Sequence, residues 1–161
     1  MKKTIQDAIN AQINVELAAA YSYLGMAAYL DARNLSGAAQ WMKKQAEEEI
    51  AHAMRFYGFV TDCDGRVILT ALSAPKKEYT SLLQVFQTSL AQEQEVTKLI
   101  YGLYELAQKE KDYVFVSFLK WFLDEQLEEE STVRNYIQKI EHVGETGAAL
   151  YLIDQELGKR E

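Results

Sequence analysis

Hydrophobic residues recur at the three- and four-residue spacing of amphipathic helices in four long segments and one short segment of the chain. The helices predicted from this spacing cover about residues 4–31, 37–61, 79–108, 113–143 and 145–157. Residues 62–78 differ, because they carry Asp64-Gly65, the β-favouring run 67–70 and Pro75, the only proline of the chain. This segment predicts an extended connection, and the whole pattern predicts an all-α protein.

The lengths of the connections indicate how these helices are arranged. Short turns join the first helix to the second and the third to the fourth, which predicts two antiparallel hairpins. Ser36 and Asp112 are the expected N-caps of the second and fourth helices, and Gly144 suits the end of the fourth. Seventeen extended residues reach roughly 56–61 Å, more than the roughly 40 Å length of a 27-residue helix, so segment 62–78 can cross the whole bundle. We therefore expect residues 1–161 to form one domain, a four-helix bundle at about 4–143 followed by a short fifth helix.

Four acidic residues lie on the apolar faces of these helices, where buried side chains are expected: Glu16, Glu49, Glu93 and Glu129. Burying a carboxylate without a partner costs several kcal/mol, so these groups must be protonated, paired with cations or bound to metal. Basic residues do not occur on the same faces near them. His52 follows Glu49 by one turn on the same face and adds a nitrogen ligand.

The polar positions of the two hairpins share one spacing. In each hairpin the second and third members follow the first by 33 and 36 residues: Glu16, Glu49 and His52 in the first, and Glu93, Gln126 and Glu129 in the second. Residues equally distant from the turn of a hairpin lie at equal height, so all six are expected in one layer near the middle of the bundle. A carboxylate-rich set with an imidazole suits iron or manganese, and Glu-x-x-His pairs on facing helices are typical of carboxylate di-iron bundles.

With these residues in place, the chain resembles the non-haem ferritins of bacteria and archaea, and the resemblance covers all five predicted helices. The resemblance implies a ferroxidase centre with two irons per subunit, held by ligands from four helices: Glu16, Glu49, His52, Glu93 and Glu129. Glu49 would bridge both irons, and Gln126 would lie beside them as a hydrogen-bonding group. The resemblance further implies that Fe(II) is oxidised by O₂ or peroxide and stored as ferric mineral in a hollow homo-oligomeric shell of 24 subunits.

In bacterial ferritins a third iron position lies close by, and its acids match Glu48, Glu125 and Glu128. A solvated helix face is an equally good interpretation of these three residues from the sequence alone, and it is the better one for Glu47 and Glu130. Tyr23 follows Glu16 by seven residues on the same face and matches a tyrosine that ferritins keep beside the metals. It is either a core residue or a hydrogen-bonding or electron-donating neighbour of the irons.

Two departures narrow the subfamily. Bacterioferritins have a haem-binding methionine directly after the bridging glutamate and Glu-x-x-His in the second hairpin, whereas this chain has Ile50 and Gln126-x-x-Glu129, so no haem is expected. The lone Cys63 excludes the Cys-x-x-Cys iron domain of rubrerythrins. The small DNA-protecting relatives lack the fifth helix and build their site between subunits, whereas here one chain carries the complete set.

Composition and charge argue against nucleic-acid binding and against membrane contact. The formal net charge of −7, without a basic cluster, argues against a nucleic-acid surface and suits a protein that attracts cations. An apolar run long enough to span a membrane and a signal peptide are both missing, so a cytoplasmic location without membrane contact is expected. Two rival hypotheses remain: a di-iron or di-manganese oxidase of an organic substrate, and a structural bundle whose buried acids are protonated and bonded to one another.

Overall fold

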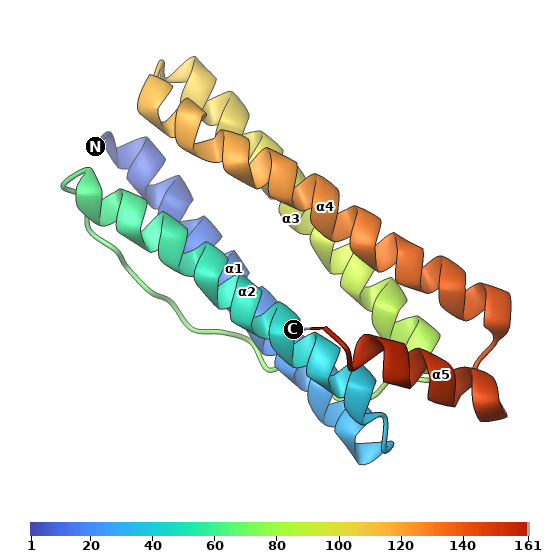
Figure 1. Cartoon of the computed structure of the whole chain (residues 1–161). Helices are drawn as coiled ribbons and strands as arrows, with labels where there is room; N and C mark the ends of the chain where they lie inside the picture. Colours follow the sequence, from blue (N-terminus) through green and yellow to red (C-terminus); the bar gives the residue numbers. More distant parts are fainter. Residues whose placement is uncertain (161) are drawn as a thin grey trace.

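The computed structural model describes residues 1–160, and every regular element in that range is a helix. The helices are α1 (Lys3–Ala32), α2 (Ser36–Asp62), α3 (Leu82–Lys109), α4 (Tyr113–Val143) and α5 (Gly147–Leu157) (Figure 1). Glu161, the last residue of the expected domain, lies outside the described residues. Within residues 1–160, no helix is both long enough and apolar enough to cross a membrane.

The four long helices form two antiparallel hairpins, α1 with α2 and α3 with α4, and the most extensive helix contacts are within these pairs. The extended segment between α2 and α3 runs along the first hairpin and returns the chain to the end of the bundle where α2 began, so α3 is parallel to α2 (Figure 1). The all-α class, the long crossover and the short fifth helix are therefore confirmed.

Polar residues of α1 hold the crossover in place. Asn10 donates to the backbone oxygen of Arg66 at 3.0 Å and accepts from the backbone N–H of Ile68 at 3.0 Å. Gln6 accepts from the backbone N–H of Arg66 at 2.8 Å. An extended segment has no internal hydrogen bonds, and among the described residues no neighbouring strand pairs with this one. The side-chain amides of Gln6 and Asn10 therefore supply partners for its backbone groups.

Local side-chain caps begin α3 and α4, whereas the N-cap residues of α1, α2 and α5 make no side-chain capping hydrogen bond. The Asp112 side chain accepts from the Phe115 N–H at 3.1 Å, as predicted for the start of α4. α3 begins at Leu82, three residues after the predicted start, because Ser81 is its N-cap and accepts from the Gln84 N–H at 3.0 Å. α5 begins at Gly147, two residues later than predicted.

The start of α2 differs from the expectation that Ser36 caps it. Ser36 is the first helical residue, and Leu35 at the N-cap position makes no side-chain bond. The cap comes from another helix, since the buried carboxylate of Asp154 in α5 accepts from the Ala38 N–H at 2.8 Å. The prediction for Ser36 is wrong because a tertiary contact replaces the local one.

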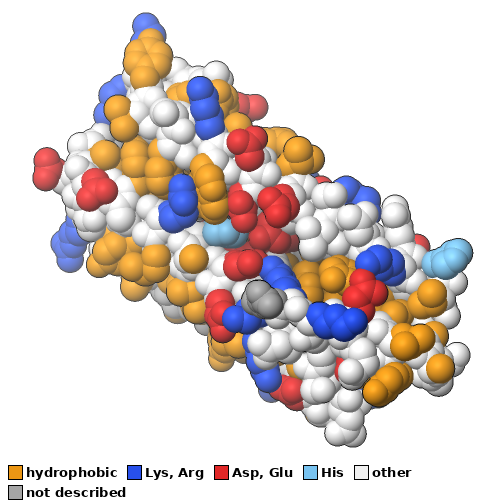
Figure 2. Space-filling view, viewed as in Figure 1, with side chains coloured by type: hydrophobic (Ala, Val, Ile, Leu, Met, Phe, Trp, Pro, Cys, Tyr) orange, Lys and Arg blue, Asp and Glu red, His pale blue; other side chains and the backbone are white. Residues whose placement is uncertain are grey.

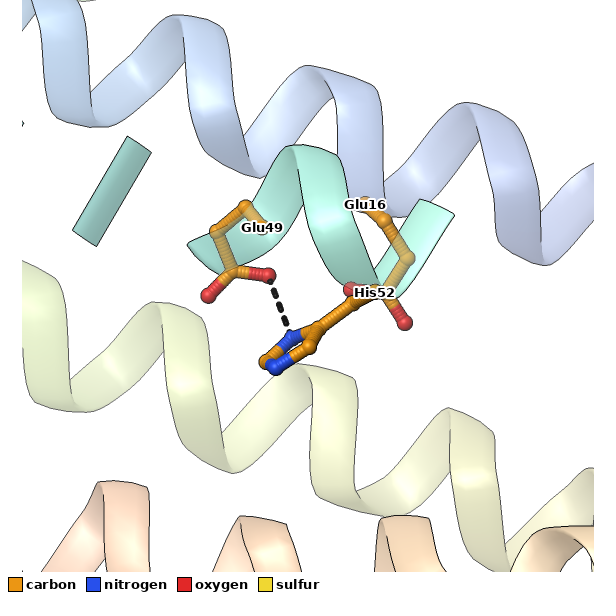
Figure 3. Close-up of side chains that lie close together, drawn as sticks. All are labelled: Glu16, Glu49 and His52. Atoms are coloured by element: carbon orange, nitrogen blue, oxygen red, sulfur yellow. Dashed lines mark hydrogen bonds and ion pairs between the residues drawn. The ribbon is translucent and has the colours of Figure 1, made fainter. Parts of the chain in front are cut away.

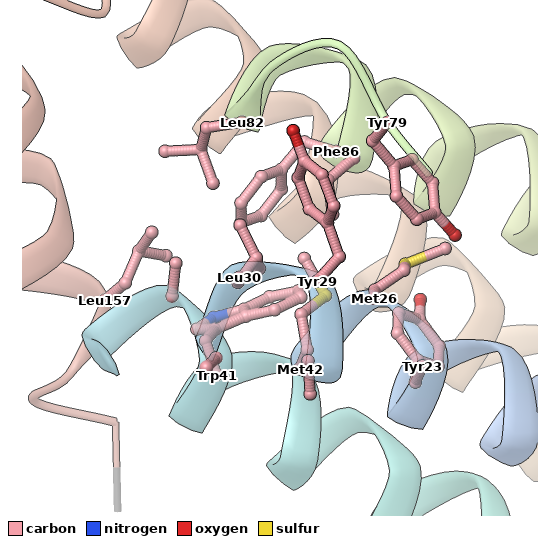
Figure 4. Packing of buried hydrophobic residues seen from close by; sticks show 14 of the residues in the cluster. Tyr23, Met26, Tyr29, Leu30, Trp41, Met42, Tyr79, Leu82, Phe86 and Leu157 are labelled. Carbon is pink, nitrogen blue, oxygen red and sulfur yellow. The ribbon is translucent and has the colours of Figure 1, made fainter. Parts of the chain in front are cut away.

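Two apolar clusters fill the bundle, one toward each end. The first surrounds Trp41 and Phe86 and includes Leu157 of α5 (Figure 4). The second surrounds Ile9, Phe56 and other side chains near the opposite ends of the same four helices. Buried polar side chains occupy the layer between the clusters, and this layer is the candidate site.

Candidate metal centre

All four long helices contribute a buried polar side chain to this middle layer. The six residues predicted from the repeated spacing are each at most 6% exposed: Glu16, Glu49, His52, Glu93, Gln126 and Glu129. Each of them lies within a long apolar helix face. Because the apolar residues in the turns before and after it are buried in the core, the polar side chain is buried as well. These six residues supply four carboxyl groups, one imidazole and one amide.

Glu16, Glu49 and His52 form one group of possible metal ligands (Figure 3). One ligand atom from each lies within 4.8 Å of the others, and His52 Nδ1 is 3.3 Å from Glu49 Oε2. Two neighbouring ligands of one octahedral ion are about 3 Å apart when each bond is about 2.1 Å long. One oxygen of Glu16 (Oε2) and one of Glu49 (Oε1) are buried without a hydrogen-bond partner. Buried carboxylate oxygens without donors are what a cation would satisfy, so this donor set fits a metal ion.

The other half of the layer is held by hydrogen bonds from the protein. The Tyr23 hydroxyl donates to Glu93 Oε1 at 2.5 Å, and Gln126 Nε2 donates to Glu93 Oε2 at 3.2 Å. Gln45 Nε2 donates to Glu129 Oε2 at 2.9 Å. These contacts place Tyr23 and Gln126 directly against a predicted ligand, so their side chains orient the Glu93 carboxylate.

Burial shifts the ionisation of this layer strongly. Burial raises the pKa of Glu16 to about 7 and that of Glu129 to about 8, with the Glu93 carboxyl adding to both shifts. The pKa of Glu49 is raised for the same reasons, burial first and Glu93 second. Burial lowers the pKa of His52 to about 4, helped by the Arg55 guanidinium. The imidazole is therefore neutral at pH 7 and has a free lone pair, whereas the acids hold protons that a binding cation would displace.

These shifts predict how stability depends on pH. Glu16 and Glu129 have folded-state pKa values above their unfolded value of 4.5, so between pH 4.5 and 8 the folded chain binds more protons than the unfolded chain. The free energy of unfolding of the metal-free protein should fall as pH rises from 5.5 to 8.5. Chemical denaturation at both pH values measures this loss, and Glu129→Gln should show a smaller one. Zn²⁺ added at pH 8.5 should restore stability, because it replaces the displaced protons; an equal loss in wild type and variant would contradict the assignment.

The three acids predicted for a third iron position lie beside this layer. Glu125, about a quarter exposed, lies with an oxygen 3.7 Å from His52 Nε2, and it groups with His52 and Glu129 as a second possible metal-binding set. Glu48 is half-exposed and paired with Arg160, and Glu128 is exposed. Acidic side chains gather about midway along this face of the molecule (Figure 2). The three acids therefore border the layer, but only Glu125 lies within ligand distance of its buried members.

Two amides in this layer were missed as functional residues. Gln12 donates to Glu16 Oε1 at 2.8 Å from one turn earlier in α1, and Gln45 reaches from α2 to Glu129 in α4. Each is a buried polar residue four positions before an acid on an apolar face. The position of Gln12 four residues before Glu16 could have indicated their hydrogen bond from the sequence. The bond from Gln45 to Glu129 could not be found this way, because it depends on how the two hairpins pack.

Comparison with known proteins agrees with this geometry. The family model for the ferritin-like domain matches residues 6–143. The bacterial non-heme ferritin of Staphylococcus aureus strain USA300 is 43% identical over 160 residues, covering 99% of this chain and 96% of the relative. The corresponding protein of Staphylococcus saprophyticus is 42% identical with the same coverage.

Solved structures show the same likeness in three dimensions. A crystal structure of the open-pore ferritin of the archaeon Archaeoglobus fulgidus superimposes with a TM-score of 0.98 at 40% identity, covering 100% of this chain and 99% of the other. An engineered closed form of that ferritin gives the same TM-score and identity. From the bundle, its buried carboxylate layer and the match over residues 6–143, we conclude that this chain belongs to the ferritin family.

Proposed function

We propose that the protein stores iron: it oxidises Fe(II) to Fe(III) at the buried layer, with O₂ or peroxide as oxidant, and holds the ferric product inside a shell of 24 copies. Iron is the substrate and the cargo of this reaction. Two Fe(II) ions each give up one electron, so a pair supplies the two electrons that reduce O₂ to H₂O₂ when two protons are added. The non-heme ferritins of staphylococci and the archaeal open-pore ferritin support the storage role by their likeness to this chain.

The observation that carries the proposal is the pair of unpartnered oxygens at the buried layer, Glu16 Oε2 and Glu49 Oε1. An unsatisfied buried polar atom costs about 1–3 kcal/mol, so a buried oxygen without a donor indicates a missing partner. Here two carboxyl groups each keep one oxygen without a donor beside a neutral imidazole. A cation bound between these groups would supply the missing partner to both oxygens.

The proposal assigns a role to each residue of the layer. Glu16 and His52 would bind one iron, Glu93 and Glu129 would bind the other, and Glu49 would bridge the two. Tyr23 and Gln126 hold the Glu93 carboxylate through their hydrogen bonds and keep it directed at the metals. Glu125 is a further ligand near His52 that could receive iron on its way out of the centre.

Oxidation of an organic substrate is a weaker candidate. Such an oxidase needs an apolar pocket beside the metals. Next to this layer the Phe56 and Phe122 rings are stacked 4.2 Å apart, and the Phe122 and Trp121 rings lie edge-on to His52. A groove of about 910 Å³ lies elsewhere, between α4 and α5, lined by residues such as His142 and Leu152. Aromatic packing therefore fills the space that such a substrate would need.

Aerobic addition of Fe(II) to the purified protein tests the proposal. We expect rapid growth of ferric absorbance, with hundreds of irons retained in a particle of roughly 440 kDa, the mass of 24 chains of 18.4 kDa. Light scattering and iron analysis of the isolated particle measure both quantities. Oxidation that stops at two irons per chain in a small particle would refute the storage role, and absence of oxidation above a buffer blank would refute the ferroxidase role.

A further inference from the structure

The last residues of the chain return to the candidate site. After α5 the chain runs back beside α2, where the C-terminus lies in Figure 1. The Arg160 guanidinium lies 4.7 Å from the centre of the Trp41 ring, donates to Glu48 Oε2 at 2.5 Å, and also donates to Gln45 Oε1. The Arg160 side chain is only 22% exposed. Three contacts of different kinds thus hold a residue that follows the final helix.

Arg160 also determines the orientation of the Gln45 side-chain amide, which contacts the predicted ligand Glu129. A guanidinium has only donors, so the oxygen of the Gln45 amide must face Arg160. The amide nitrogen then faces the opposite way, where it donates to Glu129 Oε2 at 2.9 Å. A continuous chain of hydrogen bonds runs from Arg160 through Gln45 to the Glu129 carboxylate.

The same guanidinium supplies the positive charge at Glu48. Glu48 lies on the face of α2 beside the buried layer and is one of the acids predicted for a third iron position. A guanidinium 2.5 Å from a carboxylate oxygen competes with a metal ion for that oxygen and for the negative charge. A cation that binds Glu48 through Oε2 therefore competes with Arg160, and displacement of Arg160 would also release Gln45.

We infer that Arg160 is a tethered cation of this centre: it competes with metal ions for Glu48 and, through Gln45, positions the carboxylate of Glu129. This inference rests on the proposed function for its physiological meaning, since the competing cation would be iron leaving the buried pair. Competition from a tethered charge weakens the retention of a third cation. It thereby favours onward transfer of iron over permanent binding beside the centre.

Zn²⁺ binding under equilibrium conditions tests the competition without any oxidation step. In Arg160→Gln, the Zn²⁺ site that includes Glu48 should bind about threefold to fivefold more tightly, the effect expected from losing a partly exposed ion pair. Arg160→Lys keeps the charge and should keep most of the competition. Lys159→Gln removes a neighbouring exposed charge and is the matched control for the loss of one positive charge. Equal Zn²⁺ affinities in wild type and Arg160→Gln, or an equal gain in Lys159→Gln, would overturn the inference.

Tryptophan fluorescence tests the displacement itself. The chain has two tryptophans, so in a Trp121→Phe background the signal comes from Trp41, over which Arg160 lies. Zn²⁺ should change this fluorescence when Arg160 is displaced, and the change should be lost after Arg160→Gln but kept after Lys159→Gln. An undiminished response in Arg160→Gln would contradict displacement. These readouts are independent of ferroxidase activity: failed Fe(II) oxidation with intact Zn²⁺ competition would refute the proposed function alone.

Discussion

Replacing Glu49 with glutamine should lower the initial rate of Fe(II) oxidation by at least about a hundredfold, because in the proposed centre it removes the ligand that would contact both irons. Glutamine has nearly the same shape, so the bundle should be retained and the loss should report the missing charge. The initial rate is measured by stopped-flow ferric absorbance at two irons per chain. Glu49→Ala should be at least as slow.

The same substitution should make the metal-free protein more stable. Glu49 is fully buried, and burial together with the neighbouring Glu93 raises its pKa, so keeping this carboxyl ionised opposes folding at high pH. A neutral amide has no such cost. The midpoint of thermal unfolding at pH 8.5 should rise, by about 2–4 °C for each kcal/mol gained in a chain of this size.

Glu47→Gln is the matched control for both effects. Glu47 lies two residues before Glu49 in the same helix but is exposed. Its substitution should leave the oxidation rate and the unfolding midpoint close to those of the wild type. Unchanged initial rates in Glu49→Gln would show that the bridging assignment is wrong, whereas a loss of rate accompanied by unfolding would show that the carboxyl group is needed for structure.

Replacing Gly37 with alanine should destabilise the chain by roughly 1–3 kcal/mol, the usual cost of overpacking a close contact. A Cβ at this position would lie 1.8 Å from the backbone oxygen of Asp154, so α5 would have to move away from α2. That movement also breaks the bond from the Ala38 N–H to the Asp154 carboxylate, which caps α2. Urea denaturation measures the loss, and hydrogen exchange of α5 should locate it.

Gly58→Ala is the corresponding control, since Gly58 lies in the same helix and a Cβ there meets nothing within 4 Å. It should stabilise the chain by about 0.5–1 kcal/mol, because alanine loses less backbone entropy in a helix interior. The two substitutions therefore add the same methyl group to one helix, and we expect them to change the free energy of unfolding in opposite directions. A stabilising Gly37→Ala would mean that α5 docks elsewhere in solution.

The positions of the candidate ligands could be predicted from the sequence because they depend on two short-range regularities. Helical periodicity places Glu16 and Glu93 on apolar faces, and equal distance from a hairpin turn places each opposite its partners. Neither argument requires side-chain contacts between hairpins. The burial of these six candidate residues between two apolar clusters follows from them, and the described geometry agrees.

Other features depend on contacts between residues far apart in the chain, and no local pattern contains them. The cap of α2 comes from Asp154, 116 residues after Ala38, and replaced the expected Ser36. The start of α3 at Leu82 is different, because the Ser81 hydroxyl caps it through a local bond from the Gln84 N–H. At the start of α2 the sequence offered more than one partner for the Ala38 N–H, and packing selected Asp154.

The periodic pattern by itself determined the helix content, the crossover and the height of the carboxylate layer, because each follows from spacing along the chain. Only the tertiary structure decided which oxygens of that layer remain free, which acids near it are already paired, and where the C-terminal Arg160 lies. Those properties depend on the distances between side chains of different helices. A hydrogen bond is made or lost within a few tenths of an ångström, and sequence spacing does not define distances that finely.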